Sequence, residues 1–227
     1  NTDALITLSK KSQEILESLG YKKNIYLETT LVDDNLLHSF NINKKLHKRS
    51  DVITILFLAR IEKEKGIFEI IDACESLIQS GYIIKLLIAG KGRAEKVVLS
   101  RVKNKNYIKI LGYVTGEVKT KAYIDSDIYV LPSYTEGMPT SVLEAMAFGL
   151  PVIVTPVGGL QDIIKEGLNG YFVPIANSIA LSETIIGLIN DKDLMYNMSL
   201  YNYSEAQKYY ASNVVKSIEN IYKKVLE

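Results

Sequence analysis

Two charged loops carry residue types that can handle a phosphorylated ligand, and the first holds Arg60 and Lys65-Gly66 between an apolar run and a helical pattern. Cations around a helix N-terminus can bind a diphosphate, because free N–H groups and the helix dipole attract anions there and Arg contacts phosphate through two N–H groups. Taken alone, this loop is better explained as a charged surface loop, since residues 62–64 are solvated types.

The second loop combines carboxylates with a glycine and a helix start. Glu136 lies in the loop, and Glu144 follows eight positions later, about one turn inside a helix expected to begin near Thr140. The free amides of that helix start can hold a phosphate, and Gly137 permits close approach of a ligand. A carboxylate can accept hydrogen bonds from two vicinal ribose hydroxyls at once, which gives Glu144 a binding interpretation.

Glu144 also has a purely structural interpretation. Ser141-Val-Leu-Glu144 fits a capping box, in which the glutamate only closes the helix start. The spacing of the residues leaves both interpretations open.

Two glycine pairs give weaker signals. Gly158-Gly159 precedes a short helical stretch and suits either phosphate approach or an ordinary tight turn. Gly90-Lys-Gly92 lacks the third glycine of a dinucleotide fingerprint, so the sequence predicts no NAD site.

The elements that must position these loops alternate between strand and helix with short connections. This order predicts a Rossmann-like parallel sheet with helices on both faces, and ligands bind such sheets at the carboxyl ends of the strands. The expected strands are 52–59, 83–89, 107–111, 128–131, 151–155 and 170–173, and the expected helices are 67–80, 94–103, 117–124, 140–148, a short one after 159, and the chain from 178 onward.

The organisation along the chain predicts three parts. Residues 1–32, with a strand, a helix and a second strand, are interpreted as the remnant of a preceding domain, and residues 33–51 as a polar linker. Residues 52–227 form the regular α/β domain with C-terminal helices. The linker bases (Lys44, Lys45, Lys48 and Arg49) suit a solvated face better than a membrane or phosphate contact.

The composition excludes several classes of protein. The 27 Lys and Arg nearly cancel the 26 Asp and Glu, which argues against a dedicated nucleic-acid binder. Cys74 is the single cysteine, so an internal disulfide and a Cys-based zinc cluster are excluded, and its helical apolar neighbours predict a buried side chain. The sequence contains neither a bilayer-spanning apolar stretch nor a signal peptide. Since the chain begins without Met, we expect a piece of a longer protein.

Taken together, the loops resemble the C-terminal domain of glycosyltransferase family 4, the retaining group with two Rossmann-like (GT-B) domains. The resemblance covers nearly the whole chain and rests on the joint order and spacing of motifs. These motifs are Arg60, Lys65-Gly66, Glu136 and Glu144 within Ser-Tyr-Thr-Glu-Gly-Met-Pro-Thr-Ser-Val-Leu-Glu-Ala-Met-Ala, Gly149-Leu-Pro151-Val152-Ile153, Gly158-Gly159 and Asn169-Gly170.

The resemblance implies roles for individual residues. Arg60 and Lys65-Gly66 would bind the donor diphosphate and stabilise the leaving nucleotide without a metal, helped by the Thr140 and Ser141 amides. Glu136, next to Gly137, would lie by the donor sugar, and Glu144 would hold the ribose hydroxyls. Main-chain groups near Tyr113 and Val114 would contact the base of the donor nucleotide.

The resemblance implies a bacterial-type enzyme that needs no cofactor and uses a UDP-, GDP- or ADP-sugar as donor. It would transfer the sugar, with retention, to a cell-envelope polysaccharide or lipid-linked acceptor, in the cytoplasm and peripheral to the inner face of the membrane. The acceptor pocket and histidine of the N-terminal domain have no counterpart here, since His38 and His47 lie in the linker, so the chain alone should be inactive. Thr29 to Asp33 replaces the Asn-Gly that the family usually has before its linker.

Two other functions stay open. One is a nucleotide-sugar epimerase or hydrolase of the same fold, although the paired glutamates favour transfer. The other is a non-catalytic module that binds a partner or membrane through its tyrosine-rich C-terminal tail, where packing on the missing domain or within the core is the simpler explanation.

Overall fold

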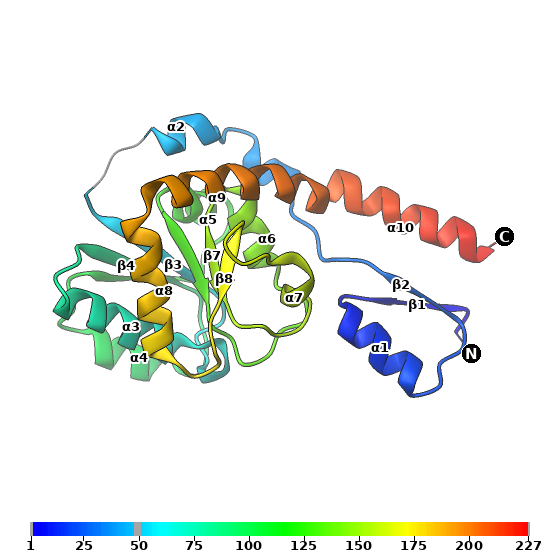
Figure 1. Cartoon of the computed structure of the whole chain (residues 1–227), viewed down its shortest axis with the longest axis horizontal. Coiled ribbons are helices and arrows are strands. Elements are labelled where there is room, and N and C mark those ends of the chain that lie inside the picture. Colours follow the sequence, from blue (N-terminus) through cyan, green and yellow to red (C-terminus); the bar gives the residue numbers. More distant parts are fainter. Residues whose placement is uncertain (1, 48–50, 227) are drawn as a thin grey trace.

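A six-stranded parallel sheet organises the chain in the computed structural model, which describes residues 2–47 and 51–226 (Figure 1). The strands follow the order β5-β4-β3-β6-β7-β8, and each hydrogen-bonded pair runs parallel. The predicted Rossmann-like α/β fold is confirmed. The strand bounds are β3 (Ile53–Leu58), β4 (Ile84–Ala89), β5 (Ile108–Gly112), β6 (Ile128–Leu131), β7 (Val152–Val154) and β8 (Gly170–Phe172).

Helices connect successive strands and lie on both faces of the sheet (Figure 1). Each crossover helix starts within a few residues of the carboxyl end of the preceding strand, so the helix N-termini gather at one edge. The crossover helices are α3 (Ile67–Gln79), α4 (Glu95–Val102), α5 (Gly116–Ile124), α6 (Thr140–Ala147) and α7 (Leu160–Ile163), with the short 3-10 turn η2 (Lys63–Lys65) before α3. The helix α8 (Ser178–Asn190) follows the last strand, β8.

The core lies between the sheet and its helices. The central strand β6 is buried along its whole length, and in β3 the residues Ile55, Leu56 and Phe57 are buried, as apolar runs predict for a sheet covered on both faces. The ring of Tyr123 stacks on that of Phe148, with centroids 5.2 Å apart. Cys74 is fully buried, and burial raises the pKa of its thiol, so the side chain serves as a small apolar group as predicted.

The first strands form a separate small unit, made of β1 (Ala4–Thr7), α1 (Lys10–Ser18) and β2 (Asn24–Leu27). β1 and β2 pair in parallel as a two-stranded sheet of their own. The hydroxyl of Ser9 caps α1 by accepting from the Ser12 amide, and Gly20 follows the helix with φ of 86°. The strand-helix-strand pattern predicted for this segment is therefore present.

The stretch interpreted as an aperiodic linker contains two short helical turns, η1 (Asp34–Leu37) and α2 (Ile42–Leu46). Ile42 is buried against Gly149, and the Lys45 ammonium donates to the Tyr123 carbonyl oxygen at 2.8 Å. This segment thus packs on the sheet domain. The prediction that Lys45 lies on a solvated face is therefore wrong. Lys48 and Arg49 lie outside the described residues.

The chain ends in the predicted helices, α9 (Lys192–Glu205), a turn η3 (Ala206–Tyr209) and α10 (Ala211–Leu226). α10 leaves the sheet domain and runs beside the first strands, so both termini lie at the same end of the molecule (Figure 1). Its Ser217 hydroxyl donates to the Glu28 carboxylate. The last helix therefore belongs spatially to the N-terminal unit.

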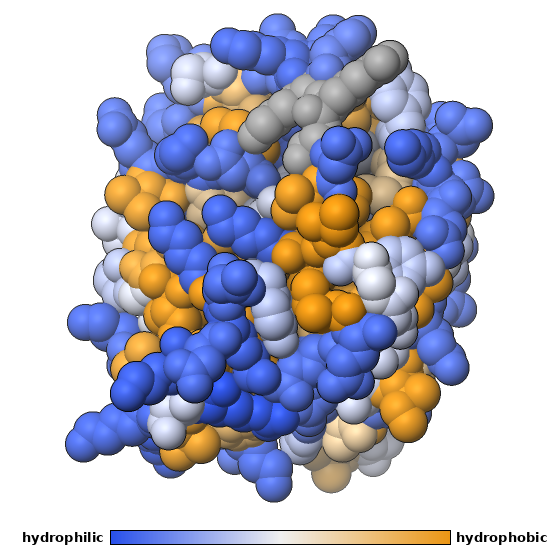
Figure 2. Space-filling view, turned by 90° about the vertical axis from the view of Figure 1, so that its left-hand side faces the viewer, coloured by the Kyte–Doolittle hydropathy of each residue, from blue (hydrophilic) through white to orange (hydrophobic). Residues whose placement is uncertain are grey.

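Hydrophilic residues predominate on the face shown in Figure 2, and hydrophobic residues are exposed between them in smaller groups. Among residues 2–47 and 51–226, no helix combines the length and apolar character that crossing a bilayer requires.

Candidate functional site

Three loops at the carboxyl edge of the sheet pack directly on one another. Gly66, after β3, has φ of 74°, and a Cβ built on it would lie 2.3 Å from the Pro132 carbonyl oxygen after β6. Gly158, after β7, has φ of 55°, and its Cβ would lie 2.1 Å from the Glu136 carbonyl oxygen. Only glycine permits both this conformation and this proximity, so these two positions hold the loops together.

Lys65 and Glu136 meet at the centre of these loops. Their side chains form an ion pair of 2.6 Å between Nζ and Oε1, across 71 residues of sequence. The Ser133 hydroxyl donates to the same carboxylate oxygen at 2.7 Å. The side chains of the pair are only 15% and 9% exposed, so their attraction is weakly screened by water.

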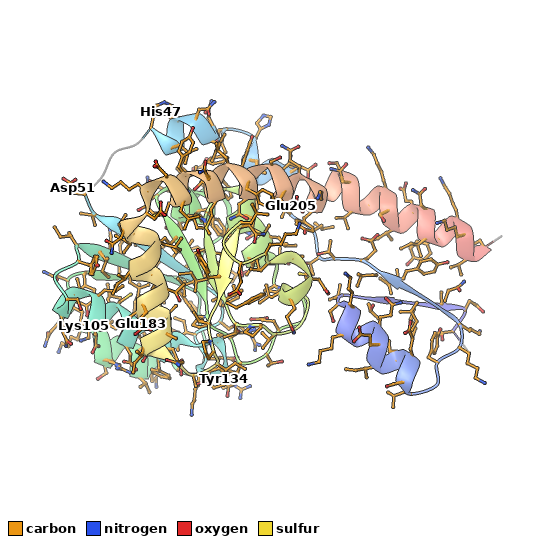
Figure 3. All side chains as sticks on the ribbon, in the orientation of Figure 1. His47, Asp51, Lys105, Tyr134, Glu183 and Glu205 are labelled. Atoms are coloured by element: carbon orange, nitrogen blue, oxygen red, sulfur yellow. The ribbon has the colours of Figure 1, made fainter. Side chains whose placement is uncertain are left out.

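The loop after β6 also binds the turn η2 and the first turn of α3. The Tyr134 amide donates to the Glu64 carbonyl oxygen at 2.8 Å, and the Tyr134 hydroxyl donates to Glu69 Oε1 at 2.6 Å. The hydrogen bond to Glu69, assisted by burial, raises the pKa of Tyr134 to about 12, so the phenol keeps its proton at neutral pH. Figure 3 labels Tyr134 at this edge of the sheet domain.

Arg60 is placed differently from Lys65. Its side chain is 66% exposed, and its Nη1 lies 3.0 Å from Glu62 Oε2. Glu62 also faces the Nε of Arg93 at 3.8 Å, and its side chain is only 14% exposed. The expectation that Glu62 is a solvated loop residue is therefore wrong, because its side chain is largely buried and pairs with guanidinium groups from the loops after β3 and β4.

The start of α6 presents its first amides without a side-chain cap. Pro139 is the N-cap residue and supplies no side-chain hydrogen bond to Thr140 or the residues after it. The Ser141 hydroxyl lies 2.7 Å from the hydroxyl of buried Tyr129. The backbone N–H groups of this first turn thus lie next to the Glu136 loop and have the character of an anion site.

Glu144 is buried inside α6, with its residue only 5% exposed. Its Oε1 lies 2.7 Å from the Lys119 ammonium, and its Oε2 accepts from the Tyr123 hydroxyl at 2.9 Å. The capping-box interpretation is wrong, because the helix begins at Thr140 and both carboxylate oxygens bind groups on α5. In the part of the chain that the structure describes, the recorded bonds of the Glu144 carboxylate go to α5 and not to the backbone N–H of Ser141.

The remaining predicted residues lie around this centre. Gly137 is exposed, and its carbonyl oxygen accepts from the Gly159 amide at 2.7 Å. The N-terminal unit reaches the same loop, since the position of a Gly137 Cβ lies 3.8 Å from Leu8 Cδ1. Val114 is buried just after β5, two strands away from β3 in the sheet order.

Sequence reasoning missed the side chains that support the two glutamates, namely Ser133, Lys119 and Tyr123. Lys119 and Tyr123 are four positions apart in a helical pattern, which places them on one face of α5. The sequence does not indicate which carboxylate this face of α5 contacts.

A comparison with protein families decides the affiliation. The family of glycosyl transferases group 1 matches residues 39–205, which is most of the chain. The chain belongs to this family. The resemblance inferred from the loop motifs is confirmed.

Several sequences similar to this group 1 chain are named as polysaccharide biosynthesis glycosyltransferases. It is 27% identical, over 97% of its own length and 58% of the relative, to the capsular polysaccharide biosynthesis glycosyltransferase CapM of Staphylococcus aureus. It is 32% identical, over 82% of its own length and 46% of the relative, to the putative teichuronic acid biosynthesis glycosyltransferase TuaC of Bacillus subtilis. The chain therefore spans only part of the length of these relatives.

Solved structures agree on the fold of this group 1 chain. Sucrose-phosphate synthase of Thermosynechococcus elongatus matches with a TM-score of 0.83 and 20% identity, over 100% of this chain and 59% of that one. HepE of Anabaena, solved in complex with UDP, matches with a TM-score of 0.83 and 20% identity, over 98% of this chain and 64% of that one. The GT-B architecture is shared, with this chain corresponding to a C-terminal-like half.

Proposed function

We propose that this chain is the donor-binding half of a retaining, metal-independent hexosyltransferase. Joined to an N-terminal domain, it binds a nucleotide-diphosphate sugar and transfers the glycosyl group to a cell-envelope polysaccharide or lipid-linked acceptor. The family, the polysaccharide-related names of CapM and TuaC, and the UDP bound to HepE all support this proposal.

The observation that carries the proposal is the Lys65–Glu136 pair beside the start of α6. A cation, a carboxylate and uncapped helix amides meet here at the carboxyl edge of a parallel sheet. The cation and amides suit a diphosphate, and the carboxylate suits sugar hydroxyls. A nucleotide-diphosphate sugar has both parts side by side.

Binding requires Lys65 to exchange partners. In the structure its charge is compensated by Glu136 at 2.6 Å. A diphosphate carries more negative charge than a carboxylate and attracts Lys65 more strongly, which frees Glu136 to accept from the donor sugar. Lys65, Arg60 and the amides of Thr140 and Ser141 then stabilise the charge that develops on the leaving nucleotide. This electrostatic assistance takes the place of a metal ion.

The nucleoside part of the donor extends toward β5. Glu144 binds the ribose hydroxyls, and main-chain groups near Val114 meet the base, while Gly66 and Gly137 allow the backbone to approach the phosphates and sugar. The base is that of UDP, GDP or ADP. We place the reaction in the cytoplasm, peripheral to the inner face of the membrane, where a lipid-linked acceptor is available.

Calorimetric titration of this chain with UDP, GDP and ADP tests donor binding. We expect one nucleotide to bind, and the Arg60→Ala/Lys65→Ala variant to lose roughly tenfold or more in affinity, as removal of charge-assisted contacts predicts. Lys63→Ala, an exposed cation in the same loop, is the matched control and should bind like the wild type. Equal affinity of all three proteins would refute the assigned diphosphate site.

Transfer is tested on the full-length protein with the matching nucleotide sugar and a lipid-linked acceptor, in the presence of EDTA. NMR of the product should show the anomeric configuration of the donor retained. An inverted product would refute the retaining mechanism, and abolition by EDTA would refute metal independence. Formation of an epimer or of free sugar alone would replace transfer with epimerase or hydrolase activity.

A further inference from the structure

A cation and a phenol on one face of α5 hold the buried carboxylate of Glu144. Lys119 and Tyr123 are one helical turn apart, and each contacts a different oxygen of that carboxylate, at 2.7 and 2.9 Å. The Lys119 side chain is 22% exposed and that of Glu144 is 7% exposed, so the ammonium lies at the rim and the carboxylate beneath it.

The phenol is a fixed donor. Burial, together with the charge of Glu144, raises the pKa of Tyr123 well above its ordinary value, so its hydroxyl remains protonated. The ring is stacked on Phe148, and the same hydroxyl lies 3.2 Å from the Ser141 carbonyl oxygen. Tyr123 therefore cannot turn away from Glu144 without leaving its place in the core.

The ammonium compensates the charge. A carboxylate this deeply buried is costly unless a cation and hydrogen bonds accompany it. Within the described residues, Lys119 is the cation recorded against Glu144. With one contact on each oxygen, the carboxylate plane cannot rotate freely.

The remaining acceptor positions match a diol. An ionised carboxylate offers about four lone-pair sites, two on each oxygen. Lys119 occupies one on Oε1 and Tyr123 one on Oε2, which leaves one acceptor position on each oxygen. Two vicinal hydroxyl groups can donate to those two positions at once.

We propose that Lys119 is a positioning residue that orients Glu144 for the two ribose hydroxyls of the donor nucleotide and so determines discrimination between ribose and deoxyribose. This inference rests on the proposed function, because it takes Glu144 as the ribose-binding group. Lys119 acts through Glu144 and does not itself take part in the reaction.

The test compares nucleotides with their 2′-deoxy analogues in the full-length protein. UDP, GDP, ADP and the three 2′-deoxy diphosphates are titrated calorimetrically into the wild type, Lys119→Met and Lys119→Arg. Lys121→Met is the matched control, because Lys121 is on the same helix, its side chain is 75% exposed, and it pairs with Asp125 and not with Glu144 in the recorded ion pairs of the described residues. Thermal melting of each variant reports folding.

We expect the Kd of the wild type for its ribonucleotide to be at least about tenfold lower than that for the deoxy analogue. This is the difference in affinity that one charge-assisted hydrogen bond provides. Lys119→Met should reduce this ratio to about twofold while binding the deoxy analogue within about threefold of the wild type. Lys119→Arg should retain most of the discrimination, and Lys121→Met all of it.

Four outcomes overturn the inference. In the first, Lys119→Met binds both nucleotides as the wild type does; in the second, it weakens both nucleotides equally, which a merely structural role predicts. In the third, the wild type binds a ribonucleotide and its 2′-deoxy analogue equally well, which refutes the role of Lys119 but not donor binding. In the fourth, the wild type binds none of the six nucleotides, which refutes both the proposed donor binding and the inference that rests on it.

Discussion

Replacing Gly66 by alanine tests how the loops after β3 and β6 are held together. The residue has φ of 74°, and the added methyl group would lie 2.3 Å from the Pro132 carbonyl oxygen and 2.6 Å from its side chain. The obstruction is mostly backbone, so it cannot be relieved by a rotamer change. The loop that carries Lys65 must therefore move away from the loop that carries Glu136.

The expected loss of stability has two parts. An L-residue in the left-handed region costs roughly 1–2 kcal/mol. Forcing a methyl group into a filled space costs typically about 1–3 kcal/mol. Gly66→Ala should therefore lower the free energy of unfolding by about 2–5 kcal/mol, before a gain of roughly 0.4–1 kcal/mol from the stiffer unfolded chain.

Gly81→Ala separates the two parts. Gly81 has φ of 85°, like Gly66, but a Cβ there would meet nothing within 4 Å. It should show only the conformational cost of roughly 1–2 kcal/mol, less the same gain from the unfolded chain. Urea unfolding followed by circular dichroism measures both variants against the wild type, with the m-value as a check that the unfolded state is unchanged.

The comparison also has a functional readout. Gly66→Ala should weaken nucleotide binding because it separates Lys65 from Glu136, whereas Gly81→Ala should not. Equal loss of stability in the two variants would refute the argument that close approach to Pro132 requires glycine at position 66.

Three further predictions concern single sites. Lys65→Met should lower the free energy of unfolding by about 3–5 kcal/mol by leaving the Glu136 charge buried alone, and adding Glu136→Gln should restore part of it in a double-mutant cycle. Ala176, a non-glycine residue with φ of 57°, should tolerate glycine with a gain of up to about 1 kcal/mol, measured by thermal melting; a loss would show that its conformation is unstrained. Since the folded pKa of Tyr134 is about 12, above its ordinary 10.0, the stability that this raised pKa provides is present below pH 10 and lost as the pH rises toward 12. Tyr134→Phe should therefore show a smaller fall in unfolding free energy over that interval, and an unchanged fall would assign the titration to other groups.

Most of the fold could be predicted from the sequence because its strands are buried on both faces. The run Ile128–Leu131 is continuously apolar and fully buried, and Pro132 ends it, so both the type and the position of this strand can be read in the sequence. The start of α6 at Thr140 was equally visible after Gly137 and Pro139. Two helical turns of four and five residues, Asp34–Leu37 and Ile42–Leu46, are too short to show periodicity, so a linker was predicted there.

The candidate site was predicted in its residue types but not in its contacts. The spacing of Glu136 and Glu144 marks two carboxylates, but it does not reveal that Lys65 holds one and Lys119 the other. Likewise, local composition makes Glu62 look solvated, although its side chain is only 14% exposed and one of its ion-pair partners, Arg93, comes from a different loop. Such pairings depend on tertiary packing, which brings together residues that no sequence period connects.

The chain crosses between the sheet domain and the N-terminal unit twice, and both crossings meet at Val32. Its amide donates to the Tyr209 carbonyl oxygen at 2.8 Å, and its own carbonyl oxygen accepts from the Ala211 amide at 2.9 Å. The two tethers are thereby hydrogen-bonded to each other, so a displacement of one past the other at Val32 would break both hydrogen bonds. The N-terminal unit also contacts the sheet domain directly, since the Lys10 amide donates to Asp162 Oδ2 at 2.9 Å, so the unit is held to the sheet domain at more than one place.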